Sequence, residues 1–71
     1  MSINERVKAV RNALNLTQKD FGQKLTLAQT YLSQIEKGDR DVTEKIQKLI
    51  CLTFNVSEEW LQNGTGEMFL E

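Results

Sequence analysis

The chain has 71 residues, which suffice for one small domain and leave no room for a second. With 39% apolar residues, 27% charged residues and no proline, its composition is typical of a folded helical protein rather than a disordered or fibrous one. The formal net charge is −1, histidine is absent, Cys51 is the one cysteine and no apolar run could span a membrane, so the sequence predicts no enzyme, metal site, cofactor, internal disulfide, signal peptide or membrane span.

The first predicted helix covers residues 2–14. Its apolar side chains recur at helical spacing and form a single stripe, so we expect it to pack against the rest of the domain. The stripe contains Ile3, Val7, Val10 and Leu14.

A second, shorter helix is predicted from Thr17 through about Leu25. Thr17 has the side chain of an N-cap, and Asp20 follows at the third helical position. Phe21 and Leu25 are expected to face inward. Gly22 interrupts the helix with the least favourable residue after proline, which indicates the close approach of another helix.

A tight turn at Thr26-Leu27 leads into a third helix, which ends at Gly38. At 100° per residue, Ala28, Leu32 and Ile35 lie within about 60° of one another and form an inward face. Amides and hydroxyls dominate the opposite face instead of the Glu/Lys pairs of an ordinary solvated helix. Such groups suit base edges in the major groove, so the pattern predicts a helix-turn-helix that binds DNA.

Two more helices are predicted before a short tail. Asp41 and Glu44 have the spacing of a capping box for a helix whose inward residues are Val42, Ile46, Leu49, Ile50 and either Thr53 or Phe54. Ser57 caps a fifth helix that holds Trp60 and Leu61 and stops at Asn63-Gly64. The tail at 65–71 contains three adjacent apolar residues, so we expect it either to fold back onto the bundle or to lead toward an interface or a deleted C-terminal region.

The ordered set of these motifs resembles the Cro and phage-repressor helix-turn-helix family, also called the xenobiotic-response-element family. The resemblance covers nearly the whole chain. It rests on Arg11, Leu16-Thr17-Gln18, Phe21-Gly22, the run from Tyr31 to Gly38 and the run from Asn55 to Gly64. It implies an all-α, lambda-repressor-like bundle of four or five helices, with the DNA-binding domain at 1–64 and a C-terminal tail at 65–71. Members of the family mostly repress transcription as operator-bound dimers.

The turn departs from the family pattern at two positions. Most members have glycine at the position of Thr26, where a helix often ends in a left-handed conformation. They also tend to have serine or threonine as an N-cap at the position of Ala28. The sequence therefore leaves the conformation of this turn, and with it the aim of the third helix, open.

Candidate site residues fall into three groups. The candidates for base contacts are Gln18, Gln29, Thr30, Ser33 and Gln34. The candidates for phosphate contacts are Thr17, Lys19, Tyr31, Lys37 and Arg40, with packing as the alternative role of Tyr31. Arg11 and Glu36 each lie about 60° from the apolar stripe of their helix, where charges are half buried and seldom unpaired, so we expect a structural ion pair between them.

The distribution of charge supports the DNA interpretation better than the total does. Residues 1–38 carry six basic and three acidic side chains, a balance of +3, whereas residues 39–71 carry three and seven, a balance of −4. Such a dipolar molecule can direct its basic half at phosphates and keep its acidic half away.

The sequence thus predicts a cytoplasmic transcriptional regulator, bacterial or phage-encoded and associated with the nucleoid when bound. Its expected partners are the major groove of an inverted-repeat DNA operator and a second copy in a weak homodimer formed by the C-terminal half, with no small-molecule ligand and no membrane. Two alternatives remain: an antitoxin that masks a toxin and regulates its own gene, and a protein-interaction module that has lost DNA binding.

Overall fold

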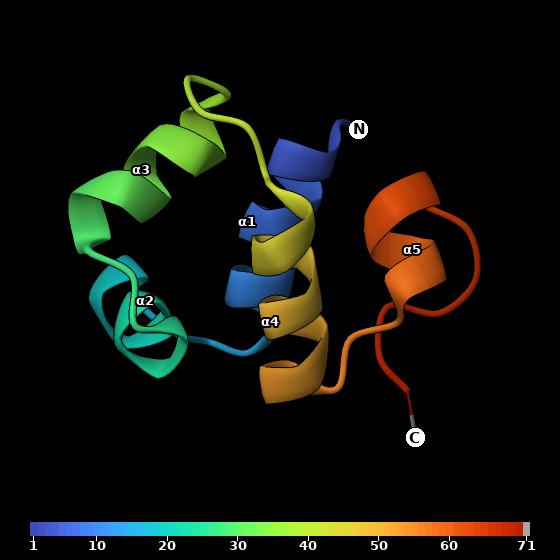
Figure 1. The fold of residues 1–71 in the computed structure, drawn as a ribbon. Helices are drawn as coiled ribbons and strands as arrows, with labels where there is room; N and C mark the ends of the chain where they lie inside the picture. Colours follow the sequence, from blue (N-terminus) through green and yellow to red (C-terminus); the bar gives the residue numbers. More distant parts are fainter. Residues whose placement is uncertain (71) are drawn as a thin grey trace.

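The apolar stripes of the sequence form five α-helices that share one core (Figure 1). The computed structural model describes residues 1–70. The helices are α1 (Ile3–Ala13), α2 (Gln18–Leu25), α3 (Gln29–Lys37), α4 (Glu44–Phe54) and α5 (Glu58–Asn63). α2 and α3 lie on one side of the central pair α1 and α4, and α5 lies on the other (Figure 1). The all-α helix-turn-helix fold predicted from the sequence is confirmed.

Side-chain caps fix where four of these helices begin. Ser2 accepts a hydrogen bond from the Glu5 backbone N–H at 3.1 Å, and the Glu5 carboxylate accepts one from the Ser2 N–H at 2.8 Å, which completes a capping box. Thr17 and Ser57 cap α2 and α5 as predicted. The prediction for α4 was wrong, because Thr43 rather than Asp41 is its N-cap and accepts from the Ile46 N–H at 3.2 Å.

The position of Val42 explains this shift. Its side chain is buried and belongs to the core, although it precedes α4. The chain therefore stays outside the helix through residue 42, and the threonine directly before Glu44 takes the capping position.

The core lies where the five helices meet, and an aromatic pair joins α2 to α4 within it. The rings of Phe21 and Phe54 stack with their centroids 4.7 Å apart and an interplanar angle of 5°. Phe54 is therefore the residue at the end of α4 that faces inward, while Thr53 is exposed. The buried apolar residues are Val7, Val10, Phe21, Leu25, Leu32, Ile35, Val42, Ile46, Ile50, Cys51, Val56 and Leu61.

Helix α5 is attached to α1 by a buried arginine, Arg6, whose burial was not predicted from the sequence. With six residues, α5 is too short to be stable by itself. Arg6 is 8% exposed and donates from Nε to the Leu61 carbonyl at 2.7 Å and from Nη2 to the Gln62 carbonyl at 2.9 Å. Its Nη1 donates to the Met1 carbonyl at 2.6 Å. The guanidinium thus satisfies the last carbonyl groups of α5 and ties them to the start of the chain.

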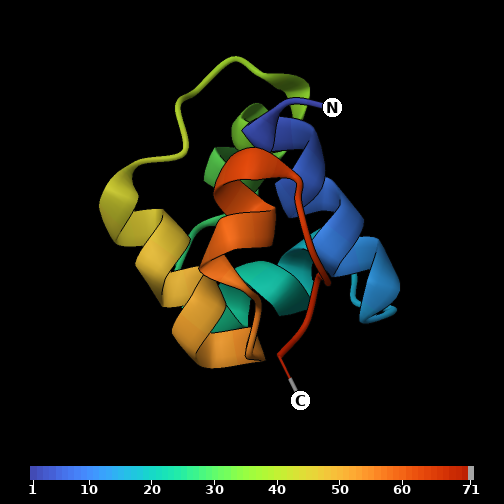
Figure 2. The ribbon, with the colours of Figure 1, turned by 90° about the vertical axis from the view of Figure 1, so that its right-hand side faces the viewer.

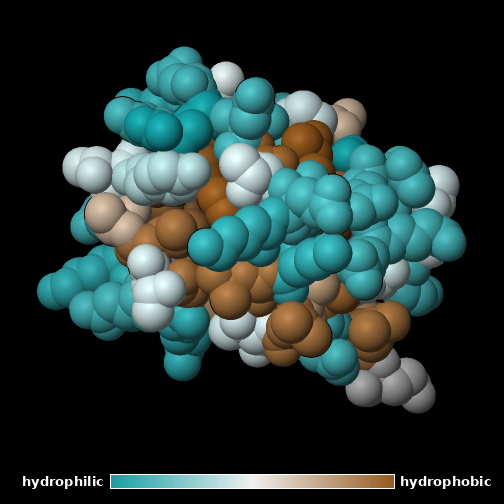
Figure 3. Space-filling model, in the orientation of Figure 1, coloured by the Kyte–Doolittle hydropathy of each residue, from teal (hydrophilic) through white to brown (hydrophobic). Residues whose placement is uncertain are grey.

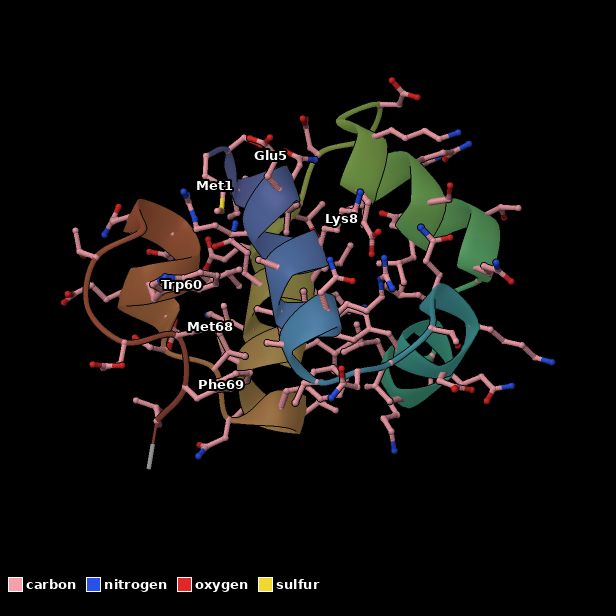
Figure 4. The ribbon with its side chains drawn as sticks, turned by 180° about the vertical axis from the view of Figure 1, so that it is seen from behind. Met1, Glu5, Lys8, Trp60, Met68 and Phe69 are labelled. Carbon is pink, nitrogen blue, oxygen red and sulfur yellow. The ribbon has the colours of Figure 1, made fainter. Side chains whose placement is uncertain are left out.

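The tail folds back onto the bundle (Figure 2). Val56 and Phe69 form an isolated antiparallel bridge, in which the Ser57 N–H donates to the Met68 carbonyl at 2.9 Å and the Leu70 N–H donates to the Asn55 carbonyl at 2.9 Å. Trp60 on α5 and Met68 and Phe69 on the tail lie on the same side of the molecule (Figure 4), and all three pack against the core. Two of the three apolar tail residues are therefore committed to the fold, and Leu70 remains 56% exposed.

Candidate nucleic-acid interface

The turn between α2 and α3 is built around Gly22. A Cβ on this residue would lie 2.7 Å from the Leu27 carbonyl oxygen, closer than van der Waals contact allows. The Leu27 N–H donates to the Gly22 carbonyl at 2.8 Å, which holds the turn against the helix. Gly22 therefore permits the approach of the turn's own backbone, and the expectation that another helix approaches here was wrong.

The turn forms without the residues that usually support it. Thr26 adopts the left-handed conformation with φ 56° and ψ 37°, which costs a non-glycine residue about 1–2 kcal/mol. Its N–H donates to the Gln23 carbonyl at 3.2 Å. Ala28 is extended and exposed at the N-cap of α3, with no side-chain cap, so the prediction that it faces inward was wrong.

Helix α3 separates its residues into a buried and an exposed face. Leu32 and Ile35 have no exposed surface and anchor the helix to the core. The opposite face is polar, and mainly hydrophilic atoms cover α3 in the space-filling view (Figure 3). This face carries Gln29, Thr30, Gln34 and Lys37, which are exposed, and Ser33, which is half buried.

An ion pair between Arg11 of α1 and Glu36 of α3 holds the two helices together. Arg11 donates from Nε to Glu36 Oε2 at 2.7 Å and from Nη2 to Oε1 at 3.0 Å. The side chains are 14% and 4% exposed, so both charges are largely desolvated. Arg11 also donates to the Leu16 carbonyl at 2.9 Å, and its hydrogen bonds with Glu36 raise its pKa. The pair fixes the position of α3 relative to α1 in a geometry that a lysine could not reproduce.

Gln18 joins this pair at the start of α2. Its Nε2 donates to Glu36 Oε1 at 3.1 Å, so the amide spans from α2 to α3. Because an ionised carboxylate only accepts, the amide nitrogen must face Glu36 and the oxygen must face away. The N-terminal end of α2 and the polar face of α3 are thereby held as one surface.

This geometry agrees with a family comparison. The sequence model of the family described as Helix-turn-helix matches residues 7–61. The chain belongs to the Cro/C1-type helix-turn-helix family. This is a family of DNA-binding transcriptional regulators and not a family of enzymes.

A curated protein is similar to this chain over part of its length. Over 55 residues the chain is 33% identical to Antitoxin PezA from Streptococcus pneumoniae serotype 4 (strain ATCC BAA-334 / TIGR4). The match covers 78% of this chain and 35% of PezA. The chain therefore spans about a third of the length of that relative.

Arg40 follows α3 and lies against the exposed face of that helix. This contact was not predicted from the sequence. Its guanidinium carbon is 4.4 Å from the centroid of the Tyr31 ring, and its Nε donates to Gln34 Oε1 at 2.9 Å. Tyr31 is half buried and also packs against the core, so the packing role left open for it is present. The other predicted phosphate contacts, Thr17, Lys19 and Lys37, are exposed at the edges of the motif.

Residues 1–70 were also compared with the requirements of a metal site and of a membrane span. No group of three or more acidic, cysteine or histidine residues among residues 1–70 is placed to hold a metal ion. None of the helices in that range has the length and apolar character needed to cross a membrane. Cys51 is buried in α4, and this burial raises the pKa of its thiol.

Proposed function

We propose that this protein is a sequence-specific transcriptional repressor that occupies an operator, with α3 in the major groove. The observation that carries the proposal is the exposed polar face of α3, which the Arg11 and Glu36 pair orients and on which Gln29, Thr30, Gln34 and Lys37 are all exposed. Repression then needs no chemistry, because a bound protein excludes other proteins from the same DNA. The protein acts in the cytoplasm, where that DNA is.

Base contacts and phosphate contacts have separate roles in this proposal. Amides and hydroxyls on α3, together with Gln18, read base edges and determine which sequence is bound. Cations and hydroxyl groups at the edges of the motif contact phosphates and fix the register of the protein on the DNA, and the cations also neutralise the phosphate charge. The base set is Gln18, Gln29, Thr30, Ser33 and Gln34, and the phosphate set is Thr17, Lys19, Tyr31, Lys37 and Arg40.

The division of roles can be tested with one substitution from each set. The operator is first identified by sequencing the DNA fragments that the purified protein retains. We expect Gln29→Ala to weaken cognate binding by roughly 1–3 kcal/mol per half-site and to leave nonspecific binding nearly unchanged, because it removes base contacts and no charge. Lys37→Ala should weaken binding to all sequences alike and flatten the salt dependence. Equal losses of specificity from both variants in mobility-shift titrations would contradict the division.

A second copy of the chain is the partner we propose for an inverted-repeat operator. Leu52 and Leu70 are 84% and 56% exposed, and both line one open groove of about 590 Å³ at the end of α4. Lys48 and Glu58 line the same groove, so a twofold axis through it can set the lysine of each protomer against the glutamate of the other. Trp60, Met68 and Phe69 are also apolar and belong to the C-terminal half of the chain, but they are partly buried and pack against the core, which leaves Leu52 and Leu70 as the better candidates for this contact.

This interface should be weak in solution and effective on DNA. Two exposed leucines per protomer offer little apolar surface for a stable interface, so binding of two half-sites supplies the effective concentration that the free protein lacks. We expect Leu52→Asp to reduce cooperativity on a two-half-site operator while affinity for a single half-site changes little. Thr53→Asp is the matched control, because Thr53 is exposed on the same helix and does not line the groove. Unchanged cooperativity in Leu52→Asp would place the interface elsewhere.

An antitoxin function is the second candidate, and the similarity to Antitoxin PezA favours it. Under this proposal the protein binds a toxin and also regulates its own gene through α3. A toxin-like reading frame beside the gene, whose product is neutralised when the two proteins are expressed together, would establish it. The third candidate, an interaction module without DNA binding, requires that no mobility shift occurs with any DNA at low salt.

A further inference from the structure

Arg40 determines which atom of the Gln34 amide faces outward. The two side chains meet through the hydrogen bond from Arg40 Nε to Gln34 Oε1, at 2.9 Å. An arginine N–H can only donate, so the amide atom that faces it must be the oxygen. The Gln34 nitrogen, which carries two donor hydrogens, is therefore directed away from Arg40.

Contacts hold both the guanidinium group and the backbone of Arg40 in place. Its guanidinium lies over the ring of Tyr31 at 4.4 Å, a distance suited to a cation–π interaction. Its backbone carbonyl accepts a hydrogen bond from Asn4 Nδ2 at 2.8 Å, and the same amide nitrogen donates to the Ile35 carbonyl at 2.9 Å. Asn4 thus ties the loop after α3 to α1, and Tyr31 supports the head group.

We propose that Arg40, supported by Tyr31, is a positioning residue that sets the polarity of Gln34 and makes guanine preferred over adenine at the base that Gln34 reads. This inference rests on the proposed function as a DNA-binding regulator, and it gives Arg40 an effect on base preference in addition to its phosphate contact. An unconstrained glutamine recognises adenine by accepting from N6 and donating to N7. Here one lone pair of the Gln34 oxygen is used by Arg40, and the other lies beside a full positive charge.

That charge disfavours the adenine amino group and favours an acceptor. Guanine presents two acceptors, O6 and N7, at the edge where adenine presents one donor and one acceptor. The outward Nε2 of Gln34 and the unshared N–H groups of Arg40 together form a surface of donors. Gln18 differs, because the Glu36 carboxylate holds its nitrogen inward.

The test measures base preference in a library in which each position of one half-site is varied in turn. The position read by Gln34 is the one at which Gln34→Ala abolishes discrimination. We expect the intact protein to prefer guanine to adenine there by roughly tenfold, and Tyr31→Leu and Arg40→Met to reduce this preference to within about threefold. Tyr31→Phe is the matched control, because it keeps the ring under Arg40 and removes the hydroxyl that could contact a phosphate.

The possible outcomes are distinct. The inference is supported if Tyr31→Phe keeps the preference for guanine over adenine and Tyr31→Leu lowers it. A loss of affinity that is equal for all sequences does not affect this comparison. Preference for adenine in the intact protein, unchanged preference in Tyr31→Leu and Arg40→Met, or no effect of Gln34→Ala at any position would overturn it. Failure of the intact protein to bind any DNA would instead overturn the proposed function, and this inference with it.

Discussion

Replacement of Glu36 by alanine is expected to lower the free energy of unfolding by on the order of 3 kcal/mol, a large fraction of what a chain of this size has. The Glu36 side chain is 4% exposed and accepts two hydrogen bonds from Arg11. Alanine at this position leaves the guanidinium largely buried without its counter-charge. Arg11→Ala should cost a similar amount for the converse reason, and urea denaturation of the two variants measures both.

A double-mutant cycle separates the interaction from the individual losses. In a cycle of Arg11→Met, Glu36→Leu and the two combined, the double variant should recover part of the stability that each single variant loses, because no buried charge is then left unpaired. Gln18→Ala serves as the control, since it removes only one hydrogen bond to Glu36 and leaves both charges paired, and it should cost about 1–2 kcal/mol, less than either charge removal. Strictly additive losses from the two single substitutions would show that Arg11 and Glu36 do not stabilise each other.

Replacement of Arg6 by methionine should detach α5 from the bundle and cost about 2–4 kcal/mol. Methionine fills similar space but donates no hydrogen bond, so the carbonyls of Met1, Leu61 and Gln62 lose the donor that they share. Trp60, the one tryptophan of the chain, lies on α5 and reports the change by fluorescence. We expect its emission to shift to longer wavelength and amide exchange in α5 to accelerate more than in α3.

Lys8→Met is the matched control for this prediction. Lys8 belongs to the same helix and is exposed, so its replacement removes a cation without uncovering any carbonyl (Figure 4). Equal stability and equal Trp60 emission in the two variants would show that Arg6 does not hold α5.

Periodicity and caps predict most of this fold because their signals are local. The stripe of α1, the Thr17 and Ser57 caps and the glycine ends of α3 and α5 each depend on residues within one or two turns. The cap of α4 was misplaced because two residues near its start can both cap, and the burial of Val42, a tertiary effect, decides between them.

Contacts between segments that are distant in the sequence were harder to predict, because some leave a clear pattern in the sequence and others do not. A charge beside an apolar stripe on each of two helices was enough to predict that Arg11 and Glu36 pair. Arg6 lies three residues after Ile3 and four before Val10, so it shares their stripe, and this was the available signal for its burial. Nothing local indicated that its partners are carbonyl groups 55 and 56 positions later in the chain.

The separation of the two faces of α3 has a consequence for how operator preference can evolve. Leu32 and Ile35 supply the helix's contribution to the core, whereas Gln29 and Thr30 are exposed and make no contact that the core requires. Substitutions at such exposed positions usually change stability by no more than about 0.5 kcal/mol. A lineage can therefore exchange these side chains one at a time and acquire a new target sequence while every intermediate remains folded.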